Sequence, residues 1–111
     1  GLKQLKPSTR QRFVTINFEY PTPEIEIEVI CNITNVQKNY ANKLVKFASH
    51  VRGENELELQ ESVSTRLLIH AAKVYKMGFS ERRACEIAIA TCLSDDAQST
   101  KALVDLIAIY F

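Results

Sequence analysis

The stretch SVSTRLLIHAAKVYKMG, residues 62–78, predicts a helix with clear signals at both ends. Ser62 is the expected N-cap, because a serine side chain accepts a hydrogen bond from a free backbone N–H of the first turn. Gly78 is the expected terminator, since glycine adopts the left-handed conformation that ends many helices. Arg66 then falls near the first turn, where the helix dipole disfavours a cation by about 0.3–1 kcal/mol.

The position of Arg66 indicates that an anion binds nearby. Free backbone N–H groups at a helix start favour phosphate, and an arginine beside them adds a fork of further donors. The alternative is that Arg66 is a solvated residue on the polar edge of the helix, paired with Glu61. The spacing of the residues leaves both interpretations open.

Composition bounds the class of protein. The 111 residues are enough for one domain, and a hydrophobic content of 46% is enough to build a core. A net charge of +1 argues against a general polyanion binder. The three cysteines form no CxxC pair and fit a reduced, cytosolic protein, and we expect Cys85 and Cys92 to pack in the core. The sequence shows no signal-peptide pattern and no apolar run of membrane length.

One strand is predicted, at residues 13–20, because apolar and polar side chains alternate there. Its apolar members are Val14, Ile16, Phe18 and Tyr20. A single strand cannot satisfy its backbone hydrogen bonds, and no second convincing strand follows. We therefore expect either a fragment whose sheet lies upstream of Gly1, or a protein that pairs this strand with another copy of itself.

Five helices are predicted after the strand. The first opens at Pro23 behind a Thr22 cap and runs to about Asn32. Its first turn holds two acids that suit the helix dipole, Glu24 and Glu26. The second helix is amphipathic and stops at Gly53, with the apolar residues Val36, Tyr40, Leu44, Phe47, Ala48 and Val51 on one face.

The helix of residues 62–78 is the third, and two more follow it. The fourth is capped by Ser80 and should bury Ala84, Ile87, Ala88 and Cys92. The fifth starts after Asp95 and carries Ala102, Leu103, Leu106, Ile107 and Tyr110. The predicted fold class is therefore mainly α, a small helical bundle with one strand near the N-terminus.

Residues 77–80 and their flanking helices outline a DNA-binding helix-turn-helix. After Arg82 and Arg83, however, the second helix reads ACEIAIA, which offers few groups that could read base edges, so we expect no nucleic-acid partner. His50 and His70 have no obvious acid or nucleophile partner. The sequence lacks a GxxxxGK[ST] loop and therefore cannot hold a nucleoside triphosphate alone.

Four motifs in order resemble the C-terminal part of the NorQ/NirQ/CbbQ group of MoxR-type AAA+ ATPases: KPSTRQRFV (6–14), FEYP (18–21), SVSTRLL (62–68) and LSDD (93–96). The resemblance implies that residues 1–22 are the tail of an ATPase core, a loop plus its last strand. It also implies that residues 23–111 form the helical lid over the nucleotide. The phosphate loop, the Walker B acid and the sensor asparagine would then lie upstream of Gly1.

The resemblance also implies roles for two arginines. Arg66 matches the sensor 2 arginine of the lid, which contacts the nucleotide phosphates and links their state to lid position. Arg12 matches the arginine finger that reaches the nucleotide of a neighbouring subunit, with Arg10 as a close alternative. A finger neutralises charge on the transferred phosphoryl group, so it acts only in a ring. The plain alternative for Arg12 is a solvated loop cation.

The function implied by the resemblance is that of a cytoplasmic, ATP-driven chaperone that activates or matures a metalloenzyme. The full-length protein would use ATP and Mg²⁺ and form a homo-oligomeric ring, whereas the fragment alone should be inactive and hold no cofactor. The implied partners are a protein with a von Willebrand A domain and a metalloenzyme target, which is nitric oxide reductase for NorQ-like proteins and Rubisco for CbbQ-like ones. The competing hypothesis is a helical protein-interaction module without nucleotide dependence. The sequence leaves the target and the ring size open.

Overall fold

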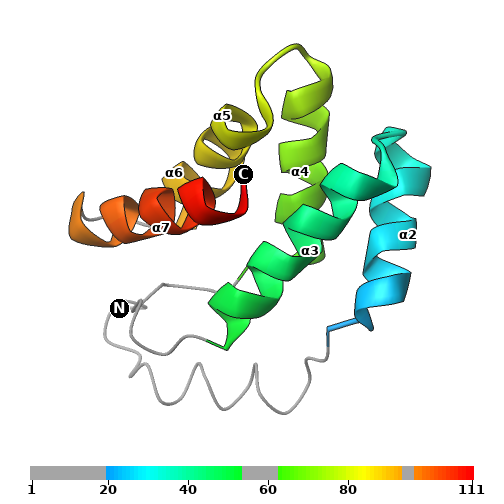
Figure 1. Ribbon diagram of the computed structural model, residues 1–111, viewed down its shortest axis with the longest axis horizontal. Coiled ribbons are helices and arrows are strands. Elements are labelled where there is room, and N and C mark those ends of the chain that lie inside the picture. Colours follow the sequence, from blue (N-terminus) through cyan, green and yellow to red (C-terminus); the bar gives the residue numbers. More distant parts are fainter. Residues whose placement is uncertain (1–19, 54–62, 94–96) are drawn as a thin grey trace, which may run out of the picture.

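The computed structural model describes residues 20–53, 63–93 and 97–111, and the secondary-structure elements in these ranges are all helices (Figure 1). The elements are α2 (Pro23–Thr34), α3 (Lys38–Arg52), α4 (Thr65–Lys76), α5 (Glu81–Cys85), the π-helix η2 (Glu86–Ala90), α6 (Thr91–Leu93) and α7 (Ala97–Tyr110). The predicted mainly α fold class is confirmed. Apart from Tyr20, the predicted strand lies outside the described residues and stays a prediction.

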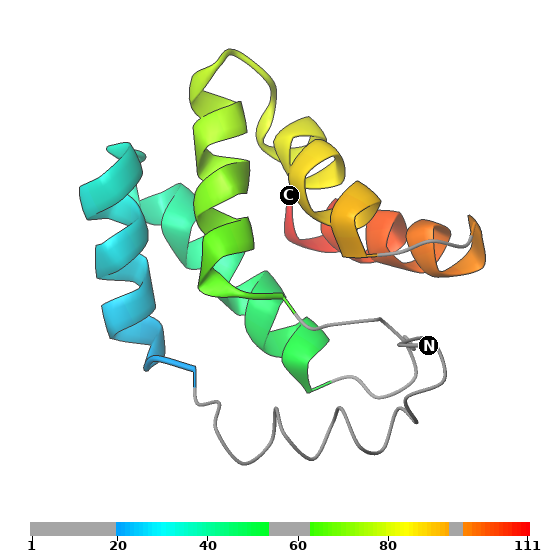
Figure 2. The same cartoon turned by 180° about the vertical axis from the view of Figure 1, so that it is seen from behind.

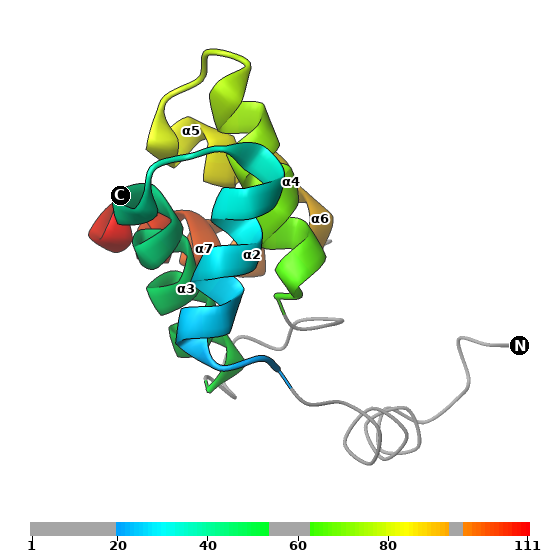
Figure 3. The ribbon, with the colours of Figure 1, turned by 90° about the vertical axis from the view of Figure 1, so that its right-hand side faces the viewer.

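The helices pack around α4 (Figures 1 and 2). α2 lies on one side of α4, α5 and η2 lie on the other, and α3 contacts both α2 and α4. Seen from the side, α2 stands in front of α3 and α4 (Figure 3). α7 closes the bundle against α3 and η2. The core between them is apolar, and its largest fully buried members include Phe47, Ile30, Leu44, Leu68, Ile89, Leu103 and Ile107.

Most helix ends follow the predicted signals. Thr22 caps α2 by accepting a hydrogen bond from the Ile25 N–H at 3.4 Å, and the helix continues past Asn32 to end at the left-handed Asn35, with φ 61°. Gly53 follows the last residue of α3. Gly78 has φ +114°, the conformation expected of a terminator after α4. These local signals therefore place the ends of α2, α3 and α4 correctly to within a few residues.

The N-cap of α4 is Ser64, so the prediction that Ser62 caps this helix is wrong. Ser64 Oγ accepts a hydrogen bond from the Leu67 N–H at 3.3 Å. In a helix begun at Ser62, the Val63 carbonyl would accept from that same N–H, but here it accepts from Arg52 Nε at 2.9 Å. A tertiary contact therefore delays the helix, and Ser62 itself lies outside the described residues.

A second correction concerns the helix that runs without interruption from Glu81 to Leu93. Ser80 caps it as predicted and Cys85 is buried, but residues 86–90 form a π turn. A π turn holds about one residue more than an α turn, so the buried face after it moves along the chain. Leu93 is buried in consequence, whereas Cys92 is exposed. The prediction that Cys92 packs in the core is wrong.

Candidate functional site

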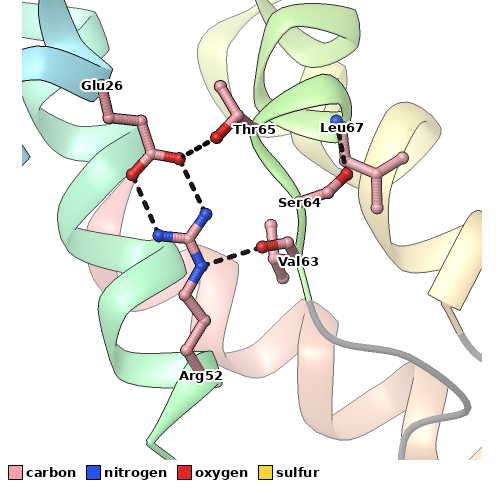
Figure 4. Close-up of polar contacts among 6 residues, drawn as sticks. All are labelled: Glu26, Arg52, Val63, Ser64, Thr65 and Leu67. Carbon is pink, nitrogen blue, oxygen red and sulfur yellow. Dashed lines mark hydrogen bonds and ion pairs between the residues drawn. The ribbon is translucent and has the colours of Figure 1, made fainter. Parts of the chain in front are cut away.

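The N-terminus of α4 lies where three helices meet, and a buried polar network holds it there (Figure 4). Glu26 comes from the first turn of α2, Arg52 from the last turn of α3, and Thr65 is the first residue of α4. Their side chains point toward one another in Figure 4. The network therefore joins parts of the chain that are far apart in sequence.

Glu26 and Arg52 form a two-pronged ion pair at the centre of this network. Arg52 Nη1 donates to Glu26 Oε1 at 2.9 Å, and Arg52 Nη2 donates to Glu26 Oε2 at 2.7 Å. Only 1% of the Glu26 side chain and 10% of the Arg52 side chain are exposed. Removing two charges from water is costly, so such a pair requires good geometry and further hydrogen bonds.

Those further hydrogen bonds reach the start of α4. Thr65 Oγ1 donates to Glu26 Oε2 at 2.8 Å, and Arg52 Nε donates to the Val63 carbonyl at 2.9 Å. The Tyr20 ring stacks on the guanidinium, with 3.7 Å from Arg52 Cζ to the ring centroid. The residues on both sides of Ser64 are thus tied to one buried ion pair.

Arg66 lies beside this network as the second residue of α4, and its side chain is exposed. The first turn of α4 contains no acid, and Arg66 forms no ion pair with any residue of the ranges 20–53, 63–93 and 97–111. Glu61, the alternative partner from the sequence, lies outside these ranges. Because Arg52 already neutralises Glu26, no carboxylate within these ranges pairs with the charge of Arg66.

The other predicted site residues are not brought to this network. Arg12 and Arg10 lie outside the described residues. His70 is exposed on α4. His50 Nδ1 lies 2.9 Å from Tyr110 Oη, at a shallow groove lined mainly by α3, with Pro23 of α2 and Tyr110 of α7. Within the described part of the chain, neither histidine contacts a carboxylate, and no group of three potential ligands could hold a metal ion.

A second buried polar contact lies at the opposite end of α3. Tyr40 Oη is 3.8 Å from Cys85 Sγ and donates to the Glu81 carbonyl at 3.5 Å. Burial raises the pKa of the Cys85 thiol to about 12, and burial also raises the pKa of Tyr40 above its usual range. Both groups are therefore neutral at physiological pH, and Cys85 has no thiolate with which to act as a nucleophile.

The ion pair between Glu26 and Arg52 was not predicted from the sequence. By local pattern alone, Glu26 is only an acid suited to the start of a helix. The spacing of the residues does indicate that Glu26 is buried. Glu26 lies one turn before Ile30, so both residues share the buried face of α2. A carboxylate on an apolar face requires a buried partner, although the sequence does not say which cation supplies it.

Comparisons with known proteins identify the family of the chain. Residues 26–110 match the CbbQ/NirQ/NorQ C-terminal family. The chain is 41% identical over 110 residues to Protein NorQ of Paracoccus denitrificans, covering 99% of this chain and 41% of that protein. It is 40% identical over 110 residues to the denitrification regulatory protein NirQ of Stutzerimonas stutzeri, covering 99% of this chain and 40% of that protein.

A third relative is Protein CbbQ of Hydrogenophilus thermoluteolus, 38% identical over 103 residues, which are 93% of this chain and 39% of that protein. The chain thus spans about two fifths of the length of these curated relatives. None of the helices that the structure describes is long and apolar enough to cross a membrane. From the family match over residues 26–110 and the identity to three relatives, the chain belongs to the CbbQ/NirQ/NorQ C-terminal family.

Proposed function

We propose that the chain is the C-terminal helical lid of a MoxR-type AAA+ ATPase, and that Arg66 contacts the phosphates of the bound nucleotide. The observation that carries this proposal is the placement of Arg66. It is the second residue of α4, exposed, and without an ion pair in the described part of the chain. Membership of the family supports the same role, because Ser64, Thr65 and Arg66 form part of the motif that resembles the lids of these ATPases.

The electrostatics of α4 favour an anion at this end. The helix dipole places partial positive charge at the N-terminus, and Arg66 adds a full positive charge there. A phosphate that accepts hydrogen bonds from the guanidinium offsets the repulsion between these two positive charges. A hydrogen bond to a charged group typically contributes about 1.5–3 kcal/mol, which is enough to make nucleotide affinity depend on this one side chain.

For the whole protein, we propose a cytoplasmic, ATP-driven chaperone that binds ATP with Mg²⁺ and acts as a homo-oligomeric ring. Its target would be a metalloenzyme such as nitric oxide reductase, or Rubisco if the protein acts like CbbQ, with a von Willebrand A domain protein as partner. Similarity to NorQ, NirQ and CbbQ supports the ATPase lid, and the chaperone role, the ring and the partners are proposed from the family resemblance. The three cysteines are all free, which suits a reducing compartment.

In the ring, we assign the role of arginine finger to Arg12, with Arg10 as the alternative. The finger would complete the active site of a neighbouring subunit. Rings that mix Arg12→Ala and wild-type subunits test the assignment, because the variant should lower turnover at the nucleotide of its wild-type neighbour. If Arg10→Ala has this effect and Arg12→Ala does not, the roles are exchanged.

A nucleotide-independent interaction module is the competing function. The exposed apolar turn between α4 and α5 favours it, since Met77 is 75% exposed and Phe79 is 44% exposed. Apolar side chains presented in this way are typical of protein contacts. This module would require no contribution from Arg66.

The test is an Arg66→Ala substitution in the protein that carries the ATPase core. We expect it to weaken ATP binding about tenfold to a hundredfold in isothermal titration calorimetry, because it removes charge-assisted hydrogen bonds. Arg82→Ala is a matched control: Arg82 is also exposed, and it is also the second residue of a serine-capped helix. Equal ATP affinities for the wild type and both variants would overturn the proposal in favour of the interaction module.

A further inference from the structure

The polar network at the start of α4 ends one residue before Arg66. Thr65 connects α4 to Glu26 by a hydrogen bond of 2.8 Å, and Glu26 is fully buried. Arg66 itself has no ion pair in the described ranges, so no salt bridge within them fixes its side chain. The backbone of the first turn is what determines where the guanidinium is presented.

We propose that Thr65 is a positioning residue for Arg66: its hydrogen bond to the buried pair of Glu26 and Arg52 fixes the first turn of α4 and thereby sets the nucleotide affinity. This inference rests on the proposed function of Arg66. Thr65 acts through Arg66 and requires no contact with the nucleotide. Glu26 and Arg52 act one step further away, as the rigid support to which Thr65 is bonded.

The need for such support follows from the physics of helix ends. The first turn of a helix lacks part of its backbone hydrogen bonding, so it opens more readily than the middle. Each opening would move Arg66 away from the phosphate, and the free energy of re-ordering it would be lost from binding. The Ser64 cap holds this turn through Leu67, while Thr65 holds it to the rest of the bundle.

The design of the network suits a positioning role. Glu26 Oε2 accepts from both Arg52 and Thr65, at 2.7 and 2.8 Å, and Oε1 accepts from Arg52 at 2.9 Å, so the carboxylate cannot rotate without breaking these bonds. Arg52 also holds the Val63 carbonyl, on the other side of the Ser64 cap. The first turn of α4 is therefore fixed relative to both α2 and α3.

The experiment measures ATP affinity in the protein that carries the ATPase core, for Thr65→Val with and without Arg66→Ala. Valine has nearly the shape of threonine and removes only the hydroxyl. Thr65→Ser restores a hydroxyl and should restore affinity, and Thr65→Ala provides a second way to remove it. Thr34→Val is the matched control, because Thr34 Oγ1 makes a buried 2.7 Å hydrogen bond to the Ile30 carbonyl, within α2 and away from the network.

We expect Thr65→Val and Thr65→Ala to weaken ATP binding about two- to tenfold, less than Arg66→Ala, because the lost hydrogen bond acts on ATP only through the position of Arg66. In the Arg66→Ala background the same changes should have no further effect, because they act only through Arg66. Thr34→Val should leave affinity unchanged even if it lowers the melting temperature. An equal loss of affinity in both backgrounds would show a merely structural role and overturn the inference.

Two other results are also decisive. If Arg66→Ala weakens binding but the Thr65 variants do not, the inference fails and the proposed function stands. If Arg66→Ala itself leaves ATP affinity unchanged, the proposed function fails, and the role assigned to Thr65 fails with it.

Discussion

The two ends of α3 are held by buried polar contacts of opposite character. At the C-terminal end, Arg52 forms an ion pair with Glu26 and bonds to Val63. At the N-terminal end, Tyr40 meets the neutral thiol of Cys85. One end buries a charged pair, whereas the other buries only neutral groups, and the ion pair of Lys43 with Glu81 beside it is partly exposed.

The residues around each end of α3 suit the polar contact that is buried there. The Tyr40 ring packs on aromatic neighbours, with centroid distances of 4.5 Å to Tyr75 and 5.8 Å to Phe111. Its contact to Cys85 adds little to that packing, since a thiol is a weak hydrogen-bonding group. The Arg52 end depends on both charges being present, because either one alone would be buried without a partner. The two ends of α3 should therefore respond very differently to the loss of one side chain.

The largest expected effect is therefore at the charged end. Arg52→Met should lower the free energy of unfolding by about 3–5 kcal/mol, because it leaves the Glu26 carboxylate buried without its counterion. Urea denaturation at neutral pH would measure this loss. For a domain whose total stability is typically about 5–15 kcal/mol, the change is large.

Two further variants show whether charge is the reason. Glu26→Leu combined with Arg52→Met should recover most of the loss, since a buried ion pair can often be replaced by apolar side chains. Arg83→Met breaks an ion pair to Glu86 of 3.0 Å whose arginine is 63% exposed, so it should cost less than about 1 kcal/mol. If the double variant is as unstable as Arg52→Met, lost packing rather than the unpaired charge explains the effect.

At the neutral end of α3, Cys85 should make the stability of the protein fall in alkaline solution. The folded protein keeps the Cys85 thiol protonated because burial raises its pKa to about 12, whereas the unfolded thiol ionises near 9.0. Above pH 9 the unfolded state therefore binds fewer protons than the folded state, and stability falls as the pH rises. The slope from Cys85 should reach about 1.4 kcal/mol per pH unit.

Urea denaturation at pH 8 and pH 10 would measure this decline in the wild type and in Cys85→Ala. The variant lacks the titrating group, so its stability should decline less over that interval. Identical declines in the two proteins would show that Cys85 ionises as readily in the folded state as in the unfolded state.

Local chemistry explains which parts of this fold could be predicted from the sequence. The caps at Thr22 and Ser80 and the terminators at Gly53 and Gly78 depend on neighbouring residues alone, and all are confirmed. The resemblance to a family was carried by short motifs and is confirmed across most of the chain. The placement of Arg66 near the start of α4 was predictable for the same reason, although its role stays a proposal.

What could not be predicted depends on contacts distant in sequence. Ser64 rather than Ser62 caps α4 because Arg52 occupies the Val63 carbonyl, and no local pattern signals that bond. Glu26 lies near the start of α2 and Arg52 lies at the end of α3, so the sequence around one residue does not identify the other as its partner. The π turn at residues 86–90 likewise shifts the buried face of its helix, and the regular α-helical spacing that places Cys92 on the same face as Cys85 cannot reveal it.

The smallest expected effect concerns Cys92, which lies on the same helix as Cys85 but beyond the π turn. Cys85 precedes the π turn and is buried, whereas Cys92 follows it and is exposed. Cys92→Ser should therefore change the free energy of unfolding by less than about 0.5 kcal/mol, as is usual for surface substitutions. Cys85→Ser should cost about 1–3 kcal/mol in the same urea denaturation, since it buries a hydroxyl in a site shaped for a thiol. Equal losses for the two variants would mean that Cys92 packs inside in solution, as an unbroken α-helix would require, and that the π turn does not form.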